Sequence, residues 1–127
     1  MAIPSGSGSE ILKSSYQPAV SNSAVTLIST TVHASVTEIA TLVSVTFTEM
    51  AGQTDEEINL YVDCGRLTIV GASGNDLYLL KKQPIGAYAT FVFSDKVVIY
   101  AGDALKVITT AAANVDVMAN WILQDWT

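Results

Sequence analysis

Alternation of apolar and polar residues with a period of two most restricts what this 127-residue chain can fold into. Residues 43–48 read Val-Ser-Val-Thr-Phe-Thr, and residues 115–124 alternate in a similar way. Successive side chains of a β-strand point to opposite sides, so such a run places one side in a core and the other toward solvent or a partner. Valine, isoleucine, threonine and tyrosine dominate these runs, as strands favour. The pattern predicts a nearly all-β protein.

Short segments with turn-forming residues separate these runs, among them residues 51–55, 83–86 and 101–103. They divide the chain into eight or nine expected strands, at about 24–33, 36–49, 57–63, 67–71, 76–82, 87–94, 97–101, 104–110 and 114–124. Many short strands are typical of a sandwich or barrel, and a large open sheet tends to curl or split in two. We therefore expect residues 24–127 to form one antiparallel two-sheet β-sandwich of the jelly-roll kind.

Residues 1–23 differ in composition from the rest of the chain. Residues 4–9 read Pro-Ser-Gly-Ser-Gly-Ser, and further serines follow at residues 14, 15, 21 and 23. Such a composition is typical of a flexible tail. We expect an extended N-terminal arm over residues 1–23 that contacts a neighbouring subunit. The first residues show neither the basic nor the apolar region of a secretory signal, so we expect synthesis in the cytoplasm.

The chain carries more apolar and fewer charged residues than an ordinary small domain. Half of its residues are apolar and 14% are charged, against about 25% in an average globular domain. The longest apolar run, residues 97–102, is far shorter than the roughly 20 residues of a membrane helix. We therefore expect no membrane association, and we expect the apolar surplus to be buried in a homo-oligomer, a larger complex, or both.

The net charge of −6 makes nucleic acid an unexpected direct partner. The six basic residues are scattered along the chain, whereas phosphate binding requires a dense basic surface.

Several apolar residues fall at positions where a free-standing monomer would carry polar side chains. A cluster of exposed apolar groups marks an interface. The residues that we expect to contact partner protein are Ile3, Ile11, Leu12, Tyr16, Met118, Ile122 and Trp126. We also expect Tyr61 and Tyr78 to point outward, and Trp121 to lie in the core.

Residues that perform catalysis are scarce, since the chain has one histidine, His33, and one cysteine, Cys64. We expect His33 to be a polar residue at a strand end and Cys64 to be a small, free, apolar side chain. A hydrolase built from Cys64, His33 and Asp63 is the alternative, but the residues around Cys64 match no nucleophile motif. Zinc would need more histidines and cysteines. We expect no enzyme, no catalytic residue and no cofactor.

The acidic residues offer the remaining candidate for a metal site. Residues 55–57 read Asp-Glu-Glu, and Asp76, Asp95 and Asp103 fall in expected loops. Calcium takes several oxygen ligands, but no Asp-x-Asp-x-Asp-Gly pattern occurs, so we expect solvated turns and no metal. The glycine-containing loop at residues 71–74 is not followed by a helix whose first turn could bind phosphate.

Two segments resemble small β-sandwich virion proteins of tailed bacteriophages. Residues 98–122 read Val-Ile-Tyr-Ala-Gly-Asp-Ala-Leu-Lys-Val-Ile-Thr-Thr-Ala-Ala-Ala-Asn-Val-Asp-Val-Met-Ala-Asn-Trp-Ile, which looks like the closing hairpin of those proteins. Residues 2–13, Ala-Ile-Pro-Ser-Gly-Ser-Gly-Ser-Glu-Ile-Leu-Lys, resemble the start of many phage structural proteins.

The resemblance implies a capsid decoration (cement) protein made in the host cytoplasm. Such proteins are often trimers that sit on the capsid exterior, bind the major capsid protein and stabilise the shell. A head-fibre, tail-fibre or adaptor component of the virion is the first alternative. A carbohydrate-binding β-sandwich is the second, with Tyr78 near Asp76 and Trp126 near Asp125 as its candidate sugar contacts.

Overall fold

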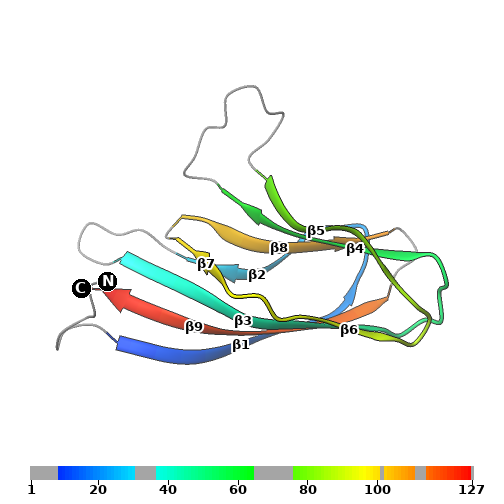
Figure 1. Ribbon diagram of the computed structural model, residues 1–127, viewed down its shortest axis with the longest axis horizontal. Coiled ribbons are helices and arrows are strands. Elements are labelled where there is room, and N and C mark those ends of the chain that lie inside the picture. The colour runs from blue at the N-terminus through cyan, green and yellow to red at the C-terminus, as the bar shows by residue number, and fades with distance from the viewer. Residues whose placement is uncertain (1–8, 31–36, 65–75, 101, 111–113, 127) are drawn as a thin grey trace, which may run out of the picture.

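Two antiparallel β-sheets, packed face to face, make up the protein (Figure 1). The computed structural model describes residues 9–30, 37–64, 76–100, 102–110 and 114–126. These residues contain no helix. Their strands are β1 (Ser9–Val20), β2 (Val25–Ser29), β3 (Thr37–Glu49), β4 (Glu56–Asp63), β5 (Asp76–Ile85), β6 (Thr90–Phe93), β7 (Val97–Ile99), β8 (Ala104–Thr109) and β9 (Val115–Trp126).

The strand order is that of a jelly roll. Sheet A has the order β1-β9-β3-β6, with β7 also paired to β3, and sheet B has the order β2-β8-β4-β5. Because β6 and β7 both pair with β3, they act as two halves of one interrupted strand. The first four strands thus pair with the later ones in reverse order, which is the pattern of a long hairpin rolled into two sheets. This topology confirms the fold class expected from the sequence.

The core lies between the sheets and contains the inward side of the period-two pattern. The largest fully buried apolar side chains are Phe47, Ile28, Leu42, Ile58, Leu60, Ile99 and Leu105. Phe47 also packs against Phe91 of the neighbouring strand, with ring centroids 6.3 Å apart. Trp121 is buried, as predicted. Burial of each large apolar side chain contributes about 1.5–3 kcal/mol to the stability of the folded state, before the entropic cost of ordering that side chain is subtracted.

Strand β1 lies within the segment that the sequence predicts to be an arm. It pairs with β9 along its whole length, from Ser9 opposite Asp125 to Val20 opposite Val115. The first half of β1 shows no clear alternation of apolar and polar residues. As an edge strand of sheet A, β1 forms strand–strand hydrogen bonds only through the backbone groups that point toward β9. The division into an arm over residues 1–23 and a domain from residue 24 stays a prediction, and residues 1–8 lie outside the described residues. The expected strand at 67–71 also lies outside them.

Two expectations about exposure are wrong. Glu56 was expected in a solvated turn, but it begins β4 and is buried, and Asp103 is buried as well. Tyr61 lies on the outward side of sheet B as expected, opposite Lys106 and Tyr78, but it is only 8% exposed. Its ring packs against that of Tyr78 on the neighbouring strand, with centroids 5.2 Å apart, and this contact covers it.

The buried carboxylate of Glu49 fixes the loop after β3. Its two oxygens accept hydrogen bonds from the backbone N–H groups of Ala51 at 2.7 Å, Gly52 at 2.5 Å and Gln53 at 3.0 Å. Burial by itself raises the pKa of Glu49, but these backbone donors outweigh it and hold the pKa below its ordinary value of 4.5. The loop therefore requires an ionised carboxylate.

The pKa of Glu56, the first residue of β4, is shifted in the opposite direction to that of Glu49. Burial raises its pKa above 4.5, and the hydrogen bond from the Thr110 backbone N–H, at 3.1 Å, together with a bond from the Thr110 hydroxyl, does not offset the loss of water. The nearby charge of Glu49 raises the pKa of Glu56 further.

Candidate protein-interaction face

The outward faces of the two sheets differ in charge. On sheet B, the Lys106 ammonium forms an ion pair with Asp63 at 3.0 Å. The ammonium of Lys81 lies 3.9 Å from the centroid of the Tyr78 ring on the same sheet. Charged side chains of both signs are typical of a surface that stays in water.

The outward face of sheet A instead presents two apolar rows that cross the strands. The strand register places Met118 between Tyr16 and Thr46, with Val92 beyond Thr46. The register also places Ile122 between Leu12 and Thr41, with Val98 beyond Thr41. We call these the first row (Tyr16, Met118, Thr46, Val92) and the second row (Leu12, Ile122, Thr41, Val98).

A polar row separates the two apolar rows and is satisfied by its own members. The Ser14 hydroxyl donates a hydrogen bond to Asn120 Oδ1 at 2.8 Å, and Asn120 Nδ2 donates to the Ser44 hydroxyl at 3.4 Å. Polar groups that already have partners can be covered by another protein at a smaller cost than unpaired ones. The whole face is therefore suited to burial.

The outer side chains of both rows are strongly exposed, whereas Met118 is 37% exposed and Ile122 is half-buried. The exposed fraction is 74% for Leu12, 71% for Tyr16, 53% for Val92 and 48% for Val98. Single exposed apolar residues are ordinary on a protein surface, but a contiguous group across four strands indicates an interface.

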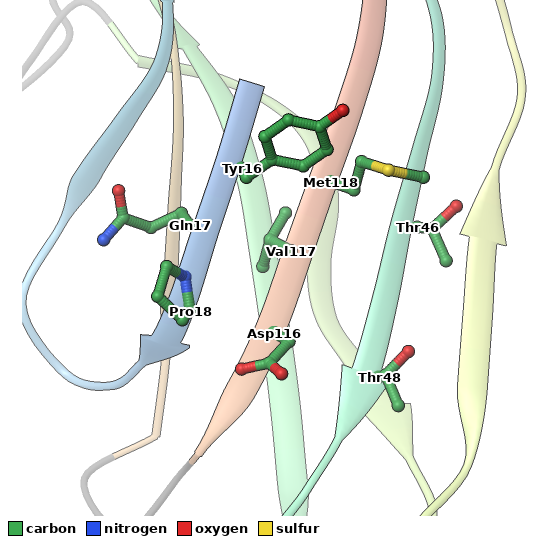
Figure 2. Close-up of a pocket in the computed structure, with 8 residues that line it drawn as sticks. All are labelled: Tyr16, Gln17, Pro18, Thr46, Thr48, Asp116, Val117 and Met118. Carbon is green, nitrogen blue, oxygen red and sulfur yellow. The ribbon is translucent and has the colours of Figure 1, made fainter. Parts of the chain in front are cut away.

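A hollow of about 400 Å³ opens in this face beside the first row (Figure 2). Its lining consists of Tyr16, Gln17, Pro18, Thr46, Thr48, Asp116, Val117 and Met118. The hollow lies where the β1–β9 register shifts, and Ala19 there has a positive φ of 55°. The backbone N–H of Ala19 donates to Asp116 Oδ1 at 3.0 Å, so the Asp116 carboxylate holds this irregular backbone in place.

Two carboxylates lie on the outward face of sheet A. Asp116 lies in the hollow, and Glu10 lies near the other end of the face, where its carboxylate accepts a hydrogen bond from Gln124 Nε2 at 2.8 Å. Lys13 belongs to the other side of β1, where its ammonium lies 5.6 Å from the centroid of the Trp121 ring. The face is apolar and weakly acidic.

The structure brings together four of the seven residues predicted to contact a partner. Leu12, Tyr16, Met118 and Ile122 share the outward face of sheet A. Ile11 is half exposed, but it lies on the other side of β1, opposite Leu123. Ile3 lies outside the described residues, and for Trp126 only the backbone pairing with Thr37 is described.

Sequence reasoning missed Val92 and Val98, the outer members of the two rows. Both stand between apolar neighbours, since residues 91–93 read Phe-Val-Phe and residues 97–99 read Val-Val-Ile. An uninterrupted apolar run does not show which residue points outward, and only the pairing with β3 reveals it.

Within the described ranges, no three His, Cys, Asp or Glu side chains gather where they would hold a metal ion. Cys64 is buried and its thiol donates to the Val62 carbonyl oxygen at 3.8 Å, and His33 lies outside those ranges. No helix of the described residues is long and apolar enough to cross a membrane.

The candidate sugar contact at Tyr78 is partly covered by protein. The Tyr78 ring is 43% exposed and contacts both the Tyr61 ring and the Lys81 ammonium. The side chain of Trp126, the other candidate, lies outside the described residues.

Comparisons with known proteins show the fold. No protein-family model and no curated protein sequence matches the chain. Among solved structures, the chain is similar to VP2 of infectious bursal disease virus in a subviral particle, with a TM-score of 0.54 and 9% identity over 96% of this chain and 33% of that one. It is also similar to the same virus's T=1 particles, with a TM-score of 0.53 and 10% identity over 96% of this chain and 32% of that one. The chain thus spans about one third of the length of these capsid proteins.

Proposed function

We propose that this chain is a virion structural protein that packs against a protein shell through the outward face of sheet A. The observation that carries the proposal is the contrast between the two outward faces of one jelly roll. Sheet A exposes two rows with apolar side chains such as Leu12 and Tyr16, whereas sheet B carries the Lys106–Asp63 ion pair and an exposed Tyr78 covered in part by the Lys81 ammonium. Of the solved structures with the same fold, one is described as a VP2 subviral particle and another as T=1 particles derived from the same virus, which supports a role in a virus shell.

In its more specific form, the proposal is a decoration protein on the capsid exterior of a tailed bacteriophage. Sheet A would face the major capsid protein, and sheet B would face solvent. The resemblance of residues 2–13 and 98–122 to phage virion proteins supports this form. The mechanism is mass action, because a protein that binds only the assembled shell shifts the assembly equilibrium toward it.

Cosedimentation tests this proposal directly. The purified chain is mixed with empty shells of the major capsid protein from the same virus, and the shells are pelleted through a sucrose cushion. We expect stoichiometric recovery of the chain with the shells and a higher temperature of shell disruption. A chain that stays in the supernatant at all concentrations would refute the decoration role.

A pair of lysine substitutions tests whether sheet A is the contact face. Met118→Lys replaces an apolar side chain of the first row with a charged one and is expected to abolish cosedimentation, because the ammonium would fill the contact surface and lose water when the shell covers it. Ser29→Lys is the matched control, since Ser29 is an exposed position on β2 of sheet B. Circular dichroism confirms that both variants fold. Equal loss of binding in the two folded variants would contradict the assignment to sheet A.

A head-fibre, tail-fibre or adaptor position predicts a different location on the particle. Immunogold labelling of intact virions distinguishes these cases, since a decoration protein is expected over the whole shell. Label confined to the tail or to a single vertex would replace the decoration role with one of these alternatives.

A further inference from the structure

The hollow on sheet A combines an apolar wall with one carboxylate. Tyr16 and Met118 lie at one end of it, and Asp116 and Thr48 lie at the other (Figure 2). Figure 2 also shows Pro18 and Thr46 on its two sides. This arrangement suits a side chain with an apolar stem and a polar head.

The carboxylate of Asp116 lacks a cationic partner within the described chain. Its Oδ1 accepts the Ala19 N–H, and no lysine or arginine lines the hollow. When a partner protein covers the face, this carboxylate loses water and needs further hydrogen-bond donors or a positive charge in exchange. A charged donor from the covering protein would supply both.

We propose that the hollow receives an arginine side chain from an adjoining subunit of another protein. The inference rests on the proposed function, because it names the chemistry of the partner that covers sheet A. The guanidinium would donate to Asp116 Oδ2, and its stem would lie against Met118 and the exposed ring of Tyr16.

Arginine fits this hollow better than lysine. A guanidinium is planar, it stacks on an aromatic ring, and it is more weakly hydrated than an ammonium. The Tyr16 ring is 71% exposed and is free to serve as the stacking surface.

The charge of the chain favours another protein over a second copy of itself. Each copy carries a net charge of −6, so two copies repel each other at long range, whereas a basic partner is attracted. A partner surface that is apolar in its centre and carries arginine would complement both the rows and Asp116.

The test uses the full chain and small probes, observed by NMR. N-acetyl-arginine amide is titrated against the chain, with the citrulline and lysine analogues as comparisons. We expect the arginine probe to shift the Met118 methyl and Ala19 amide signals, and we expect the neutral citrulline probe to bind about tenfold more weakly. In Asp116→Asn, which keeps an acceptor for the Ala19 N–H, we expect the preference for arginine to disappear.

Several outcomes would overturn the proposal. They are equal binding of arginine and citrulline, unchanged selectivity in Asp116→Asn, shifts confined to another surface, or no binding. Lysine binding as tightly as arginine would overturn the choice of arginine.

The shell assay separates failure of this inference from failure of the proposed function. Asp116→Asn cosedimenting as well as the unaltered chain would refute the arginine contact and leave the shell role intact. An unaltered chain that does not bind shells would refute the shell role, whatever the probe titration shows.

Discussion

At the scale of single residues, two buried glutamates at one end of the sandwich respond to pH in opposite directions. The pKa of Glu49 is lowered by backbone donors, so its stabilising contribution is present above pH 4.5 and is lost as the pH falls through the folded-state pKa. The pKa of Glu56 is raised by burial, so its contribution is present below pH 4.5 and is lost as the pH rises through its folded-state pKa.

We predict that Glu49→Gln lowers the thermal midpoint at pH 7 by several degrees. The amide keeps one acceptor oxygen but places an NH₂ group where the second oxygen accepts the Gln53 N–H. The difference from the unaltered chain should shrink as the pH falls below 4.5, because the carboxyl of the unfolded chain is protonated first and that of the folded chain follows at lower pH. Calorimetry at pH 7 and pH 4 measures both effects, and a pH-independent difference would contradict the ionised state of Glu49.

Glu56→Gln is predicted to have the opposite effect. The neutral side chain removes the cost of a buried charge and can still accept from Thr110, so the thermal midpoint at pH 7 should rise. Below pH 4.5 the variant and the unaltered chain should have similar midpoints. A lower midpoint at pH 7 would show that the ionised carboxylate stabilises the fold at this position.

Gly52, in the same loop, occupies a backbone position where a side chain would be strained. It has a φ of +76°, and an added Cβ would lie 2.9 Å from the Tyr88 hydroxyl oxygen. Gly52→Ala should therefore destabilise the protein by about 1–3 kcal/mol. Gly86→Ala is the matched control, because a Cβ there meets Ala89 Cβ at an ordinary 3.6 Å. Urea unfolding of the two variants should separate them clearly, and equal midpoints would contradict the strain argument.

At the scale of elements, β1 completes sheet A and covers β9. Trp121 Nε1 donates to the Ser15 hydroxyl at 3.0 Å, and the Lys13 ammonium lies over the same indole ring. The strand is thus more than a tether for a neighbouring subunit. An edge strand with exposed Leu12 and Tyr16 also requires protection from unwanted pairing, and Pro18 with the irregular backbone at Ala19 interrupts it at one end.

We predict that a chain starting at residue 21 loses its cooperative unfolding transition or becomes insoluble. Removal of β1 turns β9 into an unprotected edge and exposes the Trp121 indole. A chain starting at Ser9 is the control, since it keeps every described pairing of β1. Tryptophan fluorescence and thermal melts compare the two, and a folded chain without β1 would support a separable arm.

The sequence predicts sheet interiors better than sheet edges. The runs that form β3 and β9 alternate strongly because they lie in the middle of sheet A with one face in the core, and their strands were predicted. β1 is paired on one side only and buries few side chains, so its composition resembles that of a tail. The interaction face was predicted in part, because Met118 and Ile122 interrupt a clear alternation, whereas Val92 and Val98 stand in uniformly apolar runs.

At the scale of the whole molecule, the excess of apolar residues supports the proposed assembly into a larger complex. The resemblance to phage decoration proteins predicts a trimer, with a mass three times the 13.4 kDa of one chain. Native mass spectrometry should detect this species at micromolar concentration. A strict monomer over the accessible concentration range would contradict the trimer, and shell binding would then occur as single copies.

The pairing of the first strand with the last has a consequence for synthesis. Ser9 lies opposite Asp125, and Ser14 bonds Asn120, so segments 106 residues apart must meet before sheet A is complete. Loop-closure entropy must be overcome before such distant contacts form, and this topology folds slowly. On the ribosome, the β9 segment leaves the exit tunnel after β3, and until then β3 lacks its main partner strand. A translating polysome would bring many such unpaired strand edges together, so sheet A has to close soon after the β9 segment emerges.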